Sequence, residues 1–455
     1  MSIVIVGAGD VGFSLAEKLS SEKKDVLVIE QDERKVHRLT DEVDCQVITG
    51  SGSDPAVLKE ADIEHAELFI AVTDCDEVNI TSCVLAGLQS AVPVKIARVR
   101  HPHLTDPASQ SAYHLDKLGI DMIINPEQEA ADAILNVLSV PGAVEILDFL
   151  DHRVRLIGTH VTERCKILGV PFSNLSKLRD ELHLLVGAIF RDNELIVPKG
   201  EDVLRVGDLI YFVTEPEMVP KAMEQLGYGG GTLRRVMING GDHIGLYLAK
   251  RLEEEGVSVK IIESDPARCS VLIRNLDKAV VLNGVATDQD LLVQENIKDM
   301  DAFVAVTDDD ENNILSTLLA KRLGSSWNVT LADQTAYVPL VSAIGIDVVI
   351  NPRMLAVSAI LHYVRRGKVL SVASLREEVE LIEVEALESS HLVDKKLSNI
   401  KWPSRSLVLA IQRGDEIIIP KGETVVKPHD KVLIFAARDV VSKIEKMLTV
   451  QLEYF

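Results

Sequence analysis

A glycine-rich turn near the start of the chain restricts the possible folds more than any other feature. An apolar run at residues 3–6 leads into the turn, which reads Gly-Ala-Gly-Asp-Val-Gly at residues 7–12, and apolar residues then recur at helical spacing. A second apolar run ends on Glu30, close to the spacing of about 20 residues typical of a dinucleotide-binding βαβ unit. The pattern predicts a strand, a turn and a helix that form a nucleotide site; a purely structural turn is the alternative.

Each position of this turn has a physical role in such a site. Gly7 permits the sharp turn, Gly9 lets the backbone approach a pyrophosphate, and Gly12 lets the helix pack closely on the strand. The helix N-terminus supplies N–H groups and a partial positive charge. Glu30 would accept hydrogen bonds from a ribose 2′-OH and repel a 2′-phosphate, so we expect the site to prefer NAD to NADP.

Strands and helices alternate up to residue 140. We predict further strands at residues 46–48, 66–72, 94–97 and 121–124, with helices between them. This order is typical of a parallel sheet covered on both faces, in which ligands bind at the C-terminal ends of the strands. The candidate binding residues at these ends are Gly7, Ala8, Gly9, Asp10, Val11, Gly12, Glu30, Gly50, Ser51, Gly52, Thr73, Asp74 and Arg98.

The pattern occurs twice, so the chain is a tandem duplication. Gly240 matches Gly7, and Glu263 matches Glu30. Between the two copies, short β-like runs predict a small α+β domain that also recurs. We therefore predict an α/β protein with two tandem Rossmann-type parallel-sheet domains, each followed by a small α+β domain. The predicted boundaries are 1–125 for the first Rossmann-type domain, 126–142 for a crossover helix, 143–226 for the first small domain, 227–231 for a flexible glycine-rich linker, 232–352 for the second Rossmann-type domain, 353–370 for a second crossover helix and 371–455 for the second small domain.

The second glycine turn differs from the first in its charge. Asp242 replaces Gly9, which places a carboxylate and a Cβ where the backbone must approach a pyrophosphate. Arg98 is replaced by Asp333 in our reading of the repeat. We expect the second site to be weak or empty, although its acidic and threonine residues keep recognition of ribose or adenine possible. The candidate residues of this second site are Asn239, Gly240, Gly241, Asp242, His243, Glu263, Thr307 and Asp308.

The composition excludes several classes of partner. A net charge of −22 argues against nucleic acid and against direct binding to anionic lipid, but suits contact with the basic cytoplasmic loops of a membrane protein. No apolar run reaches the roughly 18 residues that span a bilayer, and no signal peptide precedes the first strand, so we expect a cytoplasmic protein. The five cysteines form no Cys-x-x-Cys pair, and we expect them in the core rather than in disulfides or a zinc site.

No motif for catalysis or metal binding stands out. The sequence has no Walker lysine, Gly-x-Ser-x-Gly elbow or His-Glu-x-x-His helix. His101 and His103 lack a third metal ligand, and the acidic run at residues 308–311 is better explained as charge at a helix N-terminus. We therefore expect a protein that is not an enzyme. The competing class, an NAD-dependent oxidoreductase, needs an acid–base residue beside the nicotinamide that the sequence does not reveal.

Three features that occur twice resemble the RCK (KTN) family of potassium-transport regulators. They are the glycine turn with its acidic residue, the run Phe-Ile-Ala-Val-Thr-Asp at residues 69–74 with Asn79, and the hairpin Asn-Glu-Leu-Ile-Val-Pro-Lys-Gly at residues 193–200. The resemblance covers essentially the whole chain. It implies two RCK modules, each with an N-terminal nucleotide-binding subdomain and a C-terminal subdomain.

The resemblance also implies a cellular role. A cytosolic subunit of this family assembles as a homotetramer beneath a transmembrane Trk-type potassium transporter and controls its gating. The implied cofactor is NAD(H), with ATP or ADP as a further candidate, and membrane association would pass through the partner rather than through lipid. A nucleotide-sensing scaffold for another partner is the remaining alternative.

Overall fold

The computed structural model describes residues 2–101, 104, 115–192, 194–229, 232–364, 371–375, 379–388, 390 and 392–448. The chain divides into two compact units. The first comprises Met1–Ala131, Asp333–Thr335 and Asn351–Val364, and the second comprises Asp132–Ala332, Ala336–Ile350 and Arg365–Phe455. Both halves of the duplication therefore contribute residues to both units.

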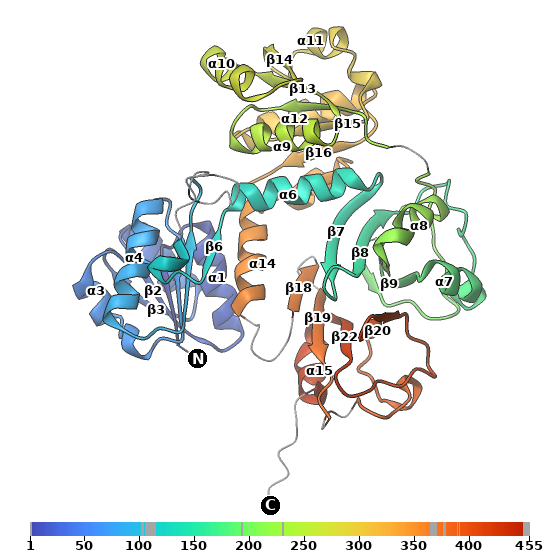
Figure 1. Ribbon diagram of the computed structural model, residues 1–455, viewed down its shortest axis with the longest axis horizontal. Helices are drawn as coiled ribbons and strands as arrows, with labels where there is room; N and C mark the ends of the chain where they lie inside the picture. The colour runs from blue at the N-terminus through green and yellow to red at the C-terminus, as the bar shows by residue number, and fades with distance from the viewer. Residues whose placement is uncertain are drawn as a thin grey trace, which may run out of the picture. The chain divides into compact units, whose positions relative to one another are not determined.

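The first Rossmann-type domain contains a six-stranded parallel sheet with the order β3-β2-β1-β4-β5-β6 (Figure 1). The chain reverses its direction of progression across the sheet between β1 and β4, which is where ligands bind in such folds. The predicted parallel sheet is confirmed. Its elements are β1 (Ser2–Val6), α1 (Asp10–Ser21), β2 (Asp25–Glu30), α2 (Glu33–Glu42), β3 (Gln46–Thr49), α3 (Pro55–Glu60), β4 (Leu68–Ala71), α4 (Asp76–Gln89), β5 (Val94–Arg98) and β6 (Met122–Ile124).

Both faces of this sheet are covered, which explains the continuous apolar run of β1. Ile3 and Ile5 face the buried cluster that includes α1, whereas Val4 and Val6 face the cluster on the opposite side. Successive side chains of a strand point to opposite faces, so a strand buried on both sides must be apolar throughout.

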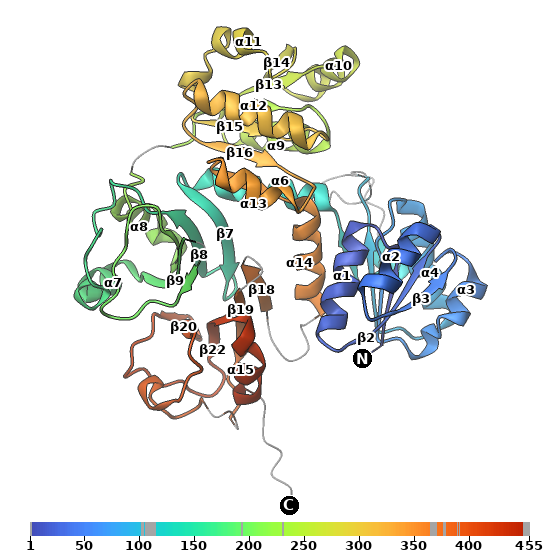
Figure 2. The ribbon, with the colours of Figure 1, turned by 180° about the vertical axis from the view of Figure 1, so that it is seen from behind.

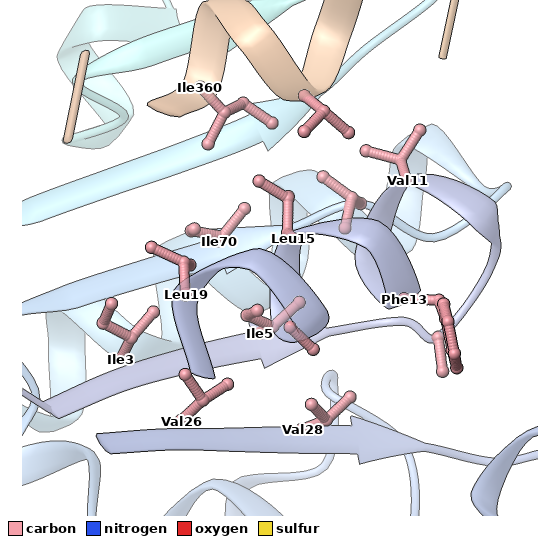
Figure 3. Close-up of a cluster of buried hydrophobic side chains, with 14 of the residues drawn as sticks. Ile3, Ile5, Val11, Phe13, Leu15, Leu19, Val26, Val28, Ile70 and Ile360 are labelled. Atoms are coloured by element: carbon pink, nitrogen blue, oxygen red, sulfur yellow. The ribbon is translucent and has the colours of Figure 1, made fainter. Parts of the chain in front are cut away.

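Helix α14 (Pro352–Val364) belongs to the first unit although its residues come from the second half of the chain. Ile360 lies in one buried cluster with Val11 and Leu15 of α1 (Figure 3). Burial of a branched aliphatic side chain stabilises a fold by about 1.5–3 kcal/mol. The helix therefore completes the core beside α1.

The first small domain contains a five-stranded antiparallel sheet with the order β10-β9-β11-β8-β7. Strand β7 and helix α7 were not predicted, because β7 mixes charged and apolar residues without strict alternation and α7 is short. The chain enters this domain through α6 (Pro126–Ser139). Its elements are β7 (Ala143–Phe149), β8 (Val154–His160), α7 (Ser176–Leu182), β9 (Leu185–Arg191), β10 (Glu194–Ile196), β11 (Leu209–Thr214) and α8 (Val219–Gln225).

Part of the predicted linker packs against the first small domain. The hydroxyl of Tyr228 donates a hydrogen bond to the carbonyl oxygen of His160 at 2.8 Å, and its ring packs over Gly142. Residues 227–229 are therefore held against the small domain. Gly230 and Gly231 lie outside the described residues.

The second Rossmann-type domain repeats the first, with the strand order β14-β13-β12-β15-β16-β17 (Figures 1 and 2). All its strand pairs are parallel. Its elements are β12 (Arg235–Asn239), α9 (His243–Glu254), β13 (Ser258–Glu263), α10 (Pro266–Asn275), β14 (Val280–Asn283), α11 (Gln289–Gln294), β15 (Ala302–Ala305), α12 (Asp310–Arg322), β16 (Asn328–Leu331), α13 (Tyr337–Ala343) and β17 (Val348–Ile350).

The second small domain has the equivalent sheet, with the order β18-β19-β22-β20-β21. Tyr211 of the first small sheet and Phe435 of the second belong to one buried cluster, so the two small domains share a core. Glu383 is buried at this boundary and accepts a hydrogen bond from the backbone N–H of Leu150 at 3.0 Å. The elements are β18 (Ser371–Leu375), β19 (Val379–Glu385), β20 (Ser406–Arg413), β21 (Glu416–Ile418), β22 (Lys431–Ala437) and α15 (Val441–Leu448).

None of the described helices combines the length and the apolar character needed to cross a bilayer.

Candidate functional site

The first glycine turn connects β1 to α1 and leaves the N-terminus of the helix accessible. Gly7 has a φ of +99°, a left-handed conformation that favours glycine. A Cβ at Gly12 would overlap the carbonyl oxygen of Gly7, so this position also requires glycine. Gly9 is the N-cap of α1, and a Cβ there would meet nothing within 4 Å. The turn is tight on its inner side and open on its outer side, where helical N–H groups have room for an anion.

Glu30 lies at the end of β2, beside this turn. Its carboxylate accepts hydrogen bonds from the backbone N–H groups of Ala8 at 2.6 Å, Gln31 at 2.7 Å and Asp32 at 2.9 Å. These bonds fix the orientation of the carboxylate and tie the turn to β2. Two carboxylate oxygens offer about four acceptor sites, so capacity remains for a ribose hydroxyl.

The loop after β3 is pressed against the core of the same domain. A Cβ at Gly52 would overlap the side chain of Val6, and one at Gly50 would crowd Val57. Ser51, between these glycines, shares a hydrogen bond of 2.8 Å with the hydroxyl of Ser53. Gly52 therefore lets this loop lie close to the end of β1, and Gly50 lets it lie close to α3.

The ends of β4 and β5 are joined by one asparagine. Asn79 accepts the backbone N–H of Thr73 at 2.8 Å and donates to the carbonyl oxygen of Arg98 at 2.8 Å. Nη1 of Arg98 donates to Asp74 at 3.1 Å, while its Nε is buried without a partner in the described part of the chain. Burial lowers the pKa of Arg98, and the neighbouring Arg100 lowers it further. This cation is therefore held at the sheet edge with spare hydrogen-bonding capacity.

A pocket of about 330 Å³ opens beside these strand ends. Cys75 lines it, is exposed, and donates from Sγ to Glu77 at 3.1 Å. The expectation that all five cysteines are core residues is wrong for Cys75, which precedes α4 in the loop at the sheet edge, and Cys45 is only partly buried. The pocket is lined by Asp74, Cys75, Asp76, Glu77, Ile80, Arg100, His101 and Leu104.

The second glycine turn, between β12 and α9, has nearly the same backbone. Gly240 has a φ of +107°, and a Cβ at Gly245 would overlap the carbonyl oxygen of Gly240. Glu263 again accepts a backbone N–H of the turn, at 2.8 Å. The N-cap of α9 is Asp242, where α1 has Gly9. The predicted carboxylate thus stands at the helix N-terminus.

Asp242 has a cationic neighbour that sequence reasoning missed. Nε of Arg268, in α10, donates to the carbonyl oxygen of Gly241 at 2.7 Å and lies 3.4 Å from a carboxylate oxygen of Asp242. Nη2 of Arg268 is buried without a partner among the described residues. Lys35 is the equivalent residue in the first half. The arginine partly neutralises Asp242 and covers the turn that Gly9 leaves open in the first domain.

The structure corrects our reading of the repeat at Arg98. In the first domain Asn79 donates to the carbonyl oxygen of Arg98; in the second, Asn313 donates to that of Leu331 at 3.3 Å. Asn313 also accepts the backbone N–H of Thr307 at 2.9 Å, as Asn79 does for its threonine. The equivalent of Arg98 is therefore Leu331, and the prediction that Asp333 replaces it was wrong.

Asp333 is instead the equivalent of Arg100. Asn125 donates to the carbonyl oxygen of Arg100 at 3.2 Å, and Asn351 donates to that of Asp333 at 3.0 Å. Between the asparagine and this strand end, the second copy is one residue shorter than the first, whereas the match of Arg98 to Asp333 assumed that it was one residue longer. Such a gap in a loop is invisible without the strand register. The second sheet edge thus lacks both arginines of the first.

The remaining predictions concern metal ligands and histidines. Among the described residues, no group of three or more His, Cys, Asp or Glu side chains could hold a metal ion. Asp309 is the N-cap of α12 and accepts the N–H of Asn312 at 2.8 Å, which confirms that the acidic run is charge at a helix N-terminus. His103, the second histidine of the suspected pair, lies outside the described residues.

One arginine beside the first turn was not predicted. Arg353, near the start of α14, forms an ion pair with Asp10, the first residue of α1, and its Nη2 lies 3.4 Å from a carboxylate oxygen of Asp333. No motif links residues so distant in sequence. The duplication offers the only signal: the first half reads Asn-Pro-Glu at residues 125–127, where the second reads Asn-Pro-Arg at residues 351–353.

Family models match four segments of this chain, and related proteins match it along its whole length. The TrkA-N domain matches residues 3–126 and 236–352, and the TrkA-C domain matches residues 160–227 and 381–449. The chain is 36% identical over 458 residues to the Trk system potassium uptake protein TrkA of Azorhizobium caulinodans, and 36% identical over 461 residues to that of Halomonas elongata. Each alignment covers 100% of both chains.

Solved structures share the fold at lower sequence identity. The RCK domain of GsuK has a TM-score of 0.62 and 20% identity, and the match covers 98% of this chain and 94% of that one. The GsuK channel bound to NAD has a TM-score of 0.62 and 19% identity, with 98% and 78% covered. The full-length relatives and the four matched domains together identify this chain as a member of the TrkA family of potassium uptake proteins.

Proposed function

We propose that this chain is a nucleotide-binding regulatory subunit of a potassium uptake system and controls a membrane-embedded Trk-type transporter. The names of relatives that align over their full length support the potassium-uptake part of the proposal. One observation carries the nucleotide part: the first glycine turn is open beyond Gly9, beside the ordered carboxylate of Glu30. An anion-accepting helix N-terminus and a ribose acceptor then lie at one sheet edge.

NAD(H) is the proposed ligand of the first domain. Glu30 suits a free ribose 2′-hydroxyl and repels a 2′-phosphate. GsuK, which has a similar fold, has been solved bound to NAD and bound to ADP. ATP or ADP would present the same adenosine and phosphate groups to the first turn. The second domain would bind more weakly, because Asp242 and Leu331 stand where the first domain has Gly9 and Arg98.

Homotetrameric assembly is part of the proposal, and exposed apolar side chains support self-association. Leu315 on α12 is 59% exposed, Leu340 on α13 is 61% exposed, and the adjacent Ile344 is 52% exposed. The hydroxyl of Tyr337 donates to Glu311 at 2.7 Å, which ties α13 to α12. Removing such apolar surface from water favours association.

The proposed membrane partner is the transmembrane Trk-type subunit. The net charge of −22 suits contact with its basic cytoplasmic loops and opposes adhesion to anionic lipid. The chain would therefore lie at the cytoplasmic face of the membrane through protein contacts.

Control of transport would follow from unequal nucleotide affinity. A ligand shifts an equilibrium between two arrangements only by the difference in its affinity for them. Moving a population from 1:99 to 99:1 needs about 5.5 kcal/mol, which several sites in one assembly can supply together.

The test combines calorimetry with potassium flux. Purified full-length chain should bind NADH and ADP, and Glu30→Ala should abolish or strongly weaken binding of NADH. Reconstituted with its transporter, the wild-type chain should give nucleotide-dependent flux that the variant loses. Absence of binding by either nucleotide would contradict the proposal. Sustained oxidation of NADH with a metabolite would instead favour the oxidoreductase class.

A further inference from the structure

Helix α14 brings a positive charge to the first glycine turn from the other half of the chain. Arg353 pairs through Nη1 with Asp10 and lies 3.4 Å through Nη2 from Asp333. All three residues belong to the first unit. The guanidinium therefore bridges the first residue of α1 and a loop of the second half.

This ion pair contributes little to holding α14 in place. The side chains of Arg353 and Asp10 are 36% and 56% exposed. Ion pairs so exposed contribute little to stability, whereas the apolar cluster around Ile360 buries several complete side chains. The arginine is consequently free to exchange its partner without loss of the helix.

The place of the pair is the one where a phosphate is proposed to bind. Asp10 follows the N-cap Gly9 directly, so Arg353 is held at the N-terminus of α1. A guanidinium matches two phosphate oxygens with parallel hydrogen bonds that are stronger than those of a neutral donor. The first half has Glu127 at the equivalent position, so this cation is specific to one half of the duplication.

We propose that Arg353 is a phosphate-binding residue of the first nucleotide site, which exchanges Asp10 for a phosphate of the bound nucleotide. The inference rests on the proposed function. Asp10 is the counter-ion in the absence of ligand and competes with the phosphate for the guanidinium.

The decisive experiment compares ligands with and without phosphate on the full-length chain. NADH and ADP are titrated by calorimetry, and adenosine is titrated as a competitor of ADP. Arg353→Ala should lower the affinities for NADH and ADP by about tenfold and leave the affinity for adenosine unchanged, because only the phosphates contact the guanidinium. The affinities of Arg353→Lys for NADH and ADP should lie between those of the wild type and those of Arg353→Ala, since lysine keeps the charge and loses the planar fork.

Asp10→Asn tests the competition from the other side. In the wild-type background it should increase the affinity for ADP several-fold. The increase should be clearly smaller when Arg353 is already alanine, because there is then no guanidinium for Asp10 to withhold from the phosphate. Arg251→Ala is the matched control for Arg353→Ala: this half-exposed arginine of α9 pairs with Glu254, and its replacement also removes one positive charge. The control should leave the affinity for ADP unchanged.

Three results would overturn the inference alone, and a fourth would overturn the proposed function as well. Equal weakening of adenosine, NADH and ADP in Arg353→Ala would mean that the residue only shapes the site, and unchanged affinities would mean that it takes no part. Equal effects of Asp10→Asn in both backgrounds would remove the competition. If the wild-type chain binds none of the three ligands, the proposed function fails and the inference with it, which separates that outcome from the others.

Discussion

The two glycine turns of this chain share a backbone but differ in what surrounds the helix N-terminus. Gly7 and Gly240 adopt the same left-handed conformation, and a glutamate ties each turn to the neighbouring strand. Beyond Gly9 the space is open, whereas Asp242 and its arginine neighbour cover the second turn. The residues that form such a turn are therefore separable from those that leave room for an anion, and duplication can preserve the first set while changing the second.

The largest effect should come from making the first turn resemble the second. Gly9→Asp places a carboxylate beside the expected pyrophosphate, and like charges brought together cost several kcal/mol. We expect NADH to bind the first domain about a hundredfold more weakly, roughly 2.7 kcal/mol, as measured by calorimetry. Gly9→Ala is the control, because a Cβ there meets nothing within 4 Å. An equal loss for alanine would mean that bulk, rather than charge, distinguishes the turns.

The close backbone packing that the two turns share predicts that equivalent substitutions destabilise both domains equally. Gly12→Ala and Gly245→Ala each force a Cβ onto a carbonyl oxygen of the preceding turn. We expect each to destabilise its own domain by about 1–3 kcal/mol, as overpacking of a tight site does. Thermal unfolding of the two variants measures this. A loss in only one variant would show that the second turn is looser than the first.

The reverse exchange should open the second turn. Asp242→Gly removes the carboxylate and leaves Arg268 to face an incoming phosphate. We expect the second domain to bind ADP about tenfold more tightly, with the stoichiometry approaching two per chain. Arg268→Gln in the same background should cancel much of the gain. If Asp242→Gly changes nothing, then Leu331 rather than Asp242 weakens this site.

The smallest effect concerns the two small domains. Glu383 in the sheet of the second small domain is equivalent to Gly158 in the sheet of the first. Burial raises the pKa of Glu383, against the opposing effects of the Leu150 N–H and Lys431. A raised pKa means that the fold prefers the protonated carboxyl, so the stability it contributes is present at low pH and lost as the pH rises through that pKa.

The corresponding variant is Glu383→Gln. It should unfold at a higher temperature than the wild type at pH 8 and lose this advantage as the pH falls towards 5, by about 1 kcal/mol at most. A constant difference across this pH range would mean that Glu383 does not titrate differently in the folded chain.

The sequence was sufficient for those features that depend on local spacing. The parallel sheets, the left-handed glycine positions and the glutamate at the end of β2 follow from short-range patterns, because each needs only the order of strand, turn and helix. The acidic N-terminus of α12 was predicted from the sequence in the same way. These parts of the fold and of the first site could be assigned without coordinates.

The failures at the two glycine turns and at the sheet edges depend on contacts between distant residues. Asp333 was matched to Arg98 because strand register, which depends on hydrogen bonds across the sheet, decides where a loop loses a residue. Arg268 reaches the second turn from another helix, and Arg353 reaches the first from the other half of the chain. No spacing rule covers such pairs, since folding rather than sequence distance brings them together.

The placement of α14 limits how this duplicated chain can evolve. A repeat whose two copies were self-sufficient could lose one copy, split into two genes or exchange copies with a relative. Here the core beside α1 is completed by Ile360 and its neighbours from the other copy. If the chain were divided between the copies, the apolar surface of α1 in the first copy and that of α14 in the second would be exposed to water. The ligand chemistry of the two copies can differ, as it does at Asp242, but the core beside α1 needs residues from both of them.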